Sequence, residues 1–131
     1  ESFHEFGLTK FRCARSVAAF SNNEIVVIDT YHNALFALKP QLAANKSQSI
    51  LCPQRLEVKG LTQPTALTVD NKDHLIVLDN PDVKVFNRKY MPLHQFQLSV
   101  RHLFPSCLAV DENNLIAVGY STGQGISLYN P

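Results

Sequence analysis

The stretch TALTVDNKDHLIVLD, residues 65–79, consists of two apolar runs separated by a polar turn. SVAAFSNNEIVVID at residues 16–29 and SCLAVDENNLIAVG at residues 106–119 have the same arrangement. Short apolar runs on either side of an Asn/Asp-rich turn are typical of β-hairpins. The sequence therefore predicts three copies of one hairpin unit.

A further short apolar segment follows each hairpin, at residues 34–38, 83–86 and 126–129. The middle run of each copy, such as residues 25–28, is apolar at consecutive positions, so both of its faces must be buried. Sheets that stack face to face provide that burial. Units of about 40 residues with four strands are typical of β-propeller blades. We therefore expect an all-β propeller made of about three four-stranded blades.

The fourth strand of each blade decides how the chain divides. Residues 56–58 and 93–98 supply it in the first two copies, whereas the third copy ends without one. Residues 3–8 match residues 93–98 and lie the same distance before a hairpin. We expect one propeller segment over 1–131, composed of an outer strand (1–9), two blades (10–60 and 61–99) and a third blade that lacks its outer strand (100–131).

A ring of three blades would not close comfortably, because propellers usually have roughly four to eight blades. We therefore expect half of a six-bladed ring. Two completions fit the sequence. The remaining blades could belong to sequence missing from this chain, or a second copy could close the ring as a symmetric homodimer, with residues 3–8 of each copy completing the last blade of the other.

Residues in the links and hairpins carry a resemblance to a known repeat. DTYHNALF at 29–36, QPTALTVD at 63–70 and FPSCLAVD at 104–111 resemble NHL repeats, with Gly119 in place of the Asp that ends the second strand. The resemblance implies a six-bladed propeller like the NHL domain of tripartite-motif proteins. In that family the domain recognises RNA or the substrate of a ubiquitin ligase.

Composition excludes some classes of partner. The chain has 131 residues with 12 Lys+Arg against 11 Asp+Glu, so it has no strongly polybasic arm for nucleic acid. Its longest aliphatic runs have four residues, against the roughly 20 that cross a bilayer, and we expect no membrane partner. Three cysteines without a C-x-x-C pair fit a reducing compartment, so we expect a cytoplasmic protein.

The chain contains no short motif of a known catalytic or phosphate-binding site. Its five histidines are scattered without metal-ligand spacing. We therefore expect no catalytic residue, no cofactor, no metal and no enzyme. A metal-dependent propeller hydrolase or lyase, with ligands converging from several blades, is the enzyme alternative.

The repeat places charge unequally on the two rims of the propeller. The turns inside the hairpins should form an acidic rim, with five carboxylates against Lys72: Glu24, Asp70, Asp73, Asp111 and Glu112. The opposite rim collects the links between blades and the turns after the second strands. It should be basic and aromatic, and its candidate binding residues are Lys10, Arg12, Arg15, Tyr31, His32, Lys59, Arg101, His102 and Tyr120. Phe11 and Phe104, in equivalent links, are expected to pack inside.

Cationic side chains neutralise phosphates, and exposed aromatic rings stack on unpaired bases. The basic, aromatic rim therefore predicts a non-enzymatic recognition module for single-stranded RNA. The alternative is a scaffold for a protein or peptide partner, such as the substrate-recognition part of a ubiquitin ligase. An ordinary solvated surface would show the same five basic side chains without any ligand.

Overall fold

The computed structural model of the chain describes residues 11–42, 49–99, 104–122 and 125–130. In these residues eleven strands form three antiparallel sheets, and no helix occurs. The first sheet contains β1 (Ala14–Ala19), β2 (Ile25–Asp29), β3 (Ala34–Leu42) and β4 (Ser49–Leu56). The second contains β5 (Ala66–Val69), β6 (Leu75–Asp79), β7 (Asp82–Phe86) and β8 (Pro92–Gln97). The third contains β9 (Pro105–Val110), β10 (Ile116–Tyr120) and β11 (Ile126–Tyr129).

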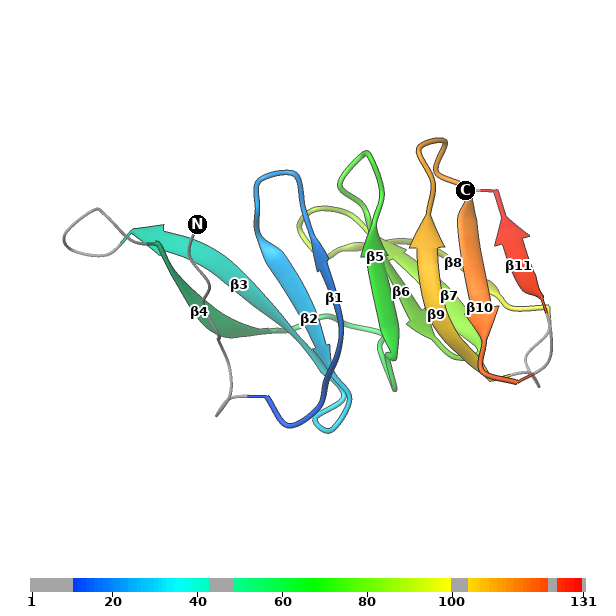
Figure 1. Cartoon of the computed structure of the whole chain (residues 1–131), viewed down its shortest axis with the longest axis horizontal. Coiled ribbons are helices and arrows are strands. Elements are labelled where there is room, and N and C mark those ends of the chain that lie inside the picture. Colours follow the sequence, from blue (N-terminus) through cyan, green and yellow to red (C-terminus); the bar gives the residue numbers. More distant parts are fainter. Residues whose placement is uncertain (1–10, 43–48, 100–103, 123–124, 131) are drawn as a thin grey trace.

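The three sheets stand side by side like the leaves of a fan (Figure 1), and we call them blades 1, 2 and 3. Within each blade, strands that are neighbours in sequence pair with each other. The first strand of blade 2, β5, contacts both β1 and β9, so the first strands lie together on one side. This arrangement is that of propeller blades, and it confirms the expected all-β propeller fold. The outer strand expected at residues 1–9 lies outside the described residues.

In the described part of the chain, no helix is long and apolar enough to span a membrane.

The three hairpin turns have the same backbone geometry. Asn23, Asp73 and Asn114 have φ angles of 72°, 60° and 65°, and each lies two residues before the second strand of its blade. Asn and Asp tolerate this left-handed region better than other residues with side chains. In the second and third turns, Asp70 and Asp111 also accept hydrogen bonds from backbone N–H groups two and four residues further on. These side chains close the turns without glycine.

This shared geometry corrects the alignment of the third copy by one residue. Counting six residues from Asn23, Asp73 and Asn114 leads to Asp29, Asp79 and Tyr120, so Tyr120 and not Gly119 occupies the strand-end position. Backbone hydrogen bonds agree, because Thr30 N donates to Cys13 O and Ser121 N donates to Phe104 O. A Cβ at Gly119 would lie 2.5 Å from Sγ of the exposed Cys107, so a larger residue there would have to displace that thiol.

Two apolar clusters lie between the blades. The cluster between blades 1 and 2 contains Phe20, Val26, Ile28, Leu35, Leu67, Leu75, Val77 and Phe86. The cluster between blades 2 and 3 contains Ala66, Ile76, Leu78, Val83, Val85, Leu98, Ile116 and Val118. Every residue of β6 is buried, as its uninterrupted apolar run predicted. The middle blade is therefore buried on both faces, and its two interfaces supply most of the hydrophobic stabilisation.

A polar network joins blades 1 and 2 at the rim of the hairpin turns. The buried Glu24 accepts a 2.6 Å hydrogen bond from the Tyr90 hydroxyl and lies 3.3 Å from an Arg88 nitrogen. Burial alone would raise the pKa of Glu24, but the hydrogen bonds from Tyr90 and Arg88 outweigh burial and lower it. Arg88 also lies over the Phe20 ring, 4.0 Å from its centroid. Because Arg88 and its neighbour Lys89 add positive charge here, the expected acidic rim is of mixed charge.

Candidate functional site

The link rim is the end of the molecule at which the links between blades meet the turns after the second strands. In Figure 1 it lies along the lower edge, opposite the hairpin turns. Its described segments are residues 11–13, 30–33, 57–65, 80–81, 104 and 121–122. The predicted binding residues belong to this rim.

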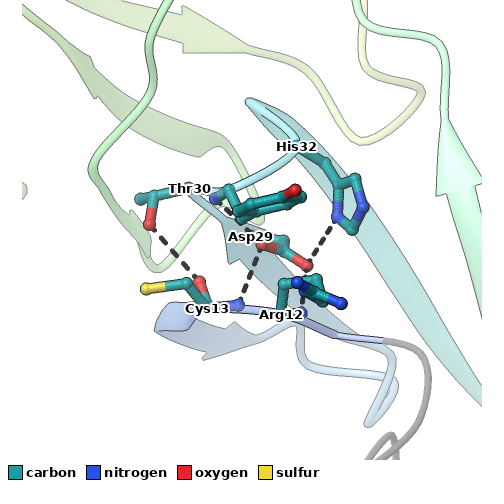
Figure 2. A network of polar contacts seen from close by, with 6 residues as sticks. Arg12, Cys13, Asp29, Thr30 and His32 are labelled. Carbon is teal, nitrogen blue, oxygen red and sulfur yellow. Dashed lines mark hydrogen bonds and ion pairs between the residues drawn. The ribbon is translucent and has the colours of Figure 1, made fainter.

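A buried carboxylate holds the link of blade 1 against its turn (Figure 2). Asp29, the last residue of β2, is fully buried and accepts hydrogen bonds from the backbone N–H groups of Arg12 (2.9 Å), Cys13 (3.1 Å) and Tyr31 (3.0 Å). Nδ1 of His32 lies 2.9 Å from Oδ2 of the same carboxylate. Asp29 thereby holds the link at residues 12–13 next to the turn at residues 31–32, although the link lies 16 and 17 residues before Asp29 in the sequence.

We expect the stability of the chain in acid to depend on Asp29. Burial alone would raise its pKa, but hydrogen bonds from Arg12, His32, Cys13 and Tyr31 outweigh burial and lower the pKa from 3.8 to about 2. A carboxyl whose pKa falls on folding stabilises the protein above its unfolded pKa, and this stabilisation is lost as the pH falls through the folded value. The free energy of unfolding should therefore decrease between pH 3.8 and about pH 2. Urea unfolding at a series of pH values measures it.

The variant Asp29→Asn should show a shallower decrease over the same pH range, because an amide does not titrate. Asp111→Asn is the matched control, since Asp111 is an exposed turn carboxylate. It should keep the pH dependence of the unmodified chain. A pH profile of Asp29→Asn as steep as that of the unmodified chain would contradict the role assigned to Asp29.

Three residues bonded to Asp29, two of them through their backbone N–H groups, form an exposed group, which we call the rim cluster: Arg12, Tyr31 and His32. The Arg12 guanidinium lies 4.8 Å from the centroid of the Tyr31 ring, within the range of a cation–π interaction. The ring of His32 meets that of Tyr31 edge-on, with 5.0 Å between centroids. Tyr31 is 63% exposed, so much of its ring remains open to a ligand. The cluster thus offers one permanent cation and two aromatic rings at one place.

Blade 2 repeats the carboxylate anchor without the cluster. Asp79 accepts hydrogen bonds from the backbone N–H groups of Thr62 (2.9 Å) and Gln63 (2.8 Å) and from the Thr62 hydroxyl (3.0 Å). Nζ of Lys84 lies 2.7 Å from Oδ2 of Asp79. Burial would raise the pKa of Asp79, but these bonds, led by that of Lys84, lower it. The following turn is Asn80–Pro81, and therefore offers no aromatic ring.

The other predicted binding residues do not join the rim cluster. Arg15 is exposed on β1 and lines a shallow pocket between the first strands, together with Ser106 and Cys107. Lys59 is exposed in the link between blades 1 and 2. The hydroxyl of Tyr120 lies 2.7 Å from Ser127 Oγ, so this side chain is engaged within blade 3. Three predicted residues lie outside the described residues: Lys10, Arg101 and His102.

One aromatic residue at the link rim differs from expectation. Phe11 packs against Phe36, with 5.2 Å between ring centroids, as predicted for a link phenylalanine. Phe104 is instead 63% exposed, so its predicted packing role is wrong. Its φ of 54° lies in the left-handed region, and Ser121 donates two hydrogen bonds to its carbonyl. The two phenylalanines are not at equivalent positions, because Ser121 N donates to the Phe104 carbonyl as Thr30 N donates to that of Cys13. Phe104 therefore corresponds to the exposed Cys13 and not to Phe11.

Within residues 11–42, 49–99, 104–122 and 125–130, no group of three or more His, Cys, Asp and Glu side chains is arranged to hold a metal ion.

The fold is shared with solved propeller structures, although no protein-family model and no curated protein matches the chain. A luciferin-regenerating enzyme matches with a TM-score of 0.65 and 12% identity, covering 85% of this chain and 38% of its own. An inactive variant of virginiamycin B lyase from Staphylococcus aureus, bound to quinupristin, gives 0.63 and 11%, covering 94% and 40%. The calcium-binding protein regucalcin from Agrobacterium tumefaciens gives 0.61 and 13%, covering 82% and 38%. This chain thus spans about two-fifths of the length of the proteins that it matches.

These structures correct the expectation about enzyme activity and limit the resemblance to NHL repeats to the fold. The expectation that the chain is not an enzyme is wrong, because proteins with this fold include a lyase and a luciferin-regenerating enzyme. It rested on the absence of short motifs, but in a propeller side chains far apart in sequence converge from several blades. The resemblance to NHL repeats holds at the level of the β-propeller, since the matching structures are propellers of other kinds.

Proposed function

We propose that the link rim of blade 1 binds single-stranded RNA, with the rim cluster of Arg12, Tyr31 and His32 at the centre of the site. The observation that carries this proposal is the exposed Arg12–Tyr31 pair, in which a guanidinium group and an aromatic ring lie side by side and are both accessible to solvent.

The chemistry of the cluster suits an unpaired nucleotide. A guanidinium pairs with phosphate oxygens through two parallel hydrogen bonds, and a planar ring stacks on any base. The carboxylate nearest to the cluster, Asp29, is fully buried and hydrogen-bonded, so it presents no exposed negative charge to a phosphate. Lys59 adds a second exposed cation on the same rim. Bases already paired in a duplex would not reach the Tyr31 ring, and single strands should bind more tightly.

The test is the binding of a short, unstructured, fluorescently labelled RNA at two salt concentrations. Tyr31→Ala should weaken binding by about 5-fold to 150-fold, which corresponds to roughly 1–3 kcal/mol for one stacked base. Arg12→Glu should weaken binding and reduce the slope of log affinity against log salt by about 0.7, because one phosphate is no longer neutralised. Both side chains are exposed and Asp29 contacts only the backbone of these residues, so both variants should fold.

Two variants serve as matched controls. Lys72→Glu makes the same charge change on the opposite rim and should bind RNA nearly as the unmodified chain does. Tyr31→Phe keeps the ring and should retain most of the affinity. If Arg12→Glu and Lys72→Glu lower affinity equally, binding is only a response to net charge and the proposed site is wrong. If the RNA does not bind at all, a protein or peptide ligand for this rim takes its place.

A further inference from the structure

The face of blade 3 that points away from blade 2 is apolar and open to solvent. Ile126 and Leu128 on β11 are 65% and 56% exposed, and Ala109 and Cys107 on β9 are exposed beside them. Leu128 lines a shallow apolar hollow with Ala109, Leu115 and Ala117. Contiguous exposed apolar surface of this kind marks a site of association.

The same positions are buried in the other two blades. Ile126 pairs with Gly119, as Leu35 pairs with Ile28 in blade 1 and Val83 with Leu78 in blade 2. Leu35 is 2% exposed and Val83 is fully buried, because each packs against the next blade. The open face of blade 3 is therefore a blade interface of the kind already present twice in this molecule.

Blade 1 carries the complementary half of that interface. Val17 on β1 is 64% exposed, whereas its counterpart in blade 2, Leu67, is 4% exposed and lies in the same apolar cluster as Leu35. In blade 3 the counterpart is Leu108, which packs into the second cluster with Val83. Thus Leu67 and Leu108 cover Leu35 and Val83 in the two existing interfaces. The equivalent residue of blade 1, Val17, is exposed at the other end of the molecule.

We infer that two copies of this chain join through these faces, with Ile126 and Leu128 of one copy packed against Val17 of the other. Two-fold symmetry makes this contact twice, so both open faces are covered and no further copy can add. Two sets of three blades give six, within the roughly four to eight of closed propellers.

Sedimentation velocity and light scattering of the full chain test the inference. The expected mass is twice the 14.7 kDa of one chain, with no larger species. Leu128→Asp should raise the dissociation constant of the dimer by roughly 100-fold or more, because it places an unpaired carboxylate in the interface. The side chain is exposed in the single chain, so the variant should keep the β-sheet circular dichroism of the unmodified chain. Leu93→Asp is the matched control, since Leu93 is exposed on β8, away from both faces, and should leave the dimer intact.

Mixing two variants separates this interface from any other contact. Val17→Asp and Leu128→Asp should each be monomeric alone, but a mixture retains one unmodified pair of faces and should form heterodimers of intermediate affinity. A monomeric unmodified chain, a series of larger oligomers, or a dimer as tight in Leu128→Asp as in the unmodified chain would overturn the inference. RNA binding at the link rim is measured separately, so failure of one proposal does not decide the other.

Discussion

Replacing Asp79 by alanine should lower the free energy of unfolding by about 3–5 kcal/mol, the range measured when one partner of a buried ion pair is removed. The carboxylate is buried, and its loss leaves the Lys84 ammonium, with only 13% of that side chain exposed, without a counter-charge. It also leaves the N–H groups of Thr62 and Gln63 without their acceptor. Because these residues form the link into blade 2, the variant should lose stability throughout the chain. Denaturation by urea at neutral pH measures the loss.

A neighbouring carboxylate supplies the control. Asp82 lies three residues after Asp79, and its Oδ1 is buried without a hydrogen-bond partner among the described residues. Asp82→Ala should therefore change the free energy of unfolding by less than about 0.5 kcal/mol or raise it. In the double variant Asp79→Ala/Lys84→Met no charge remains unpaired, so it should be more stable than Asp79→Ala alone. A loss below about 1 kcal/mol in Asp79→Ala would show that water replaces the carboxylate and that the anchor is not structural.

Phe86→Ala should cost a similar amount, about 3–5 kcal/mol, as expected for a large aromatic residue removed from a core. Phe86 is 1% exposed in the cluster between blades 1 and 2. Its removal leaves a cavity at the interface that joins two blades, and the rigid strands on either side cannot close around it. Phe104→Ala removes the same atoms from an exposed position and should cost less than about 0.5 kcal/mol. Equal losses in the two variants would contradict the view that the blade interfaces hold the fold together.

The fold could be predicted because the residues that determine it form a local pattern, an apolar hairpin, that is repeated three times in the sequence. An apolar run such as that of β6 can be buried on both faces only if sheets stack on either side of it, and three copies of the pattern make those sheets. Two details were wrong. The fourth strand of blade 1 was predicted at residues 56–58, but β4 spans Ser49–Leu56, because β3 continues to Leu42 and pairs with all of β4. The alignment of the third copy was wrong by one residue. Leu115 extends the apolar run of the third copy, but the left-handed Asn114 sets where the strand begins, and β10 starts at Ile116. Turn geometry therefore decides the register, and apolarity does not.

The candidate site is predictable only in part. The repeat places links and turns at the same end of each blade, and this is enough to assign Arg12, Tyr31 and His32 to one rim. The anchor that brings them together, Asp29, reads in the sequence as a turn residue, since its contacts with a link 16 and 17 residues away have no signature there. The pairing of Glu24 with Arg88, 64 residues apart, likewise has no local signal, and it alters the expected charge of the opposite rim.

The three links of the molecule are fastened by different chemistry. Asp29 and Asp79 secure the first two with carboxylates, whereas the third is held by the uncharged hydroxyl of Ser121 on the Phe104 carbonyl. Hydroxyl bonds do not titrate in acid. Acidification should therefore raise amide hydrogen exchange first in the links at 12–13 and 62–63, while the Ser121 N–H bonded to the Phe104 carbonyl stays protected. The order in which the blades separate in acid would then depend on which links are held by a carboxylate, and not on how much surface each blade buries.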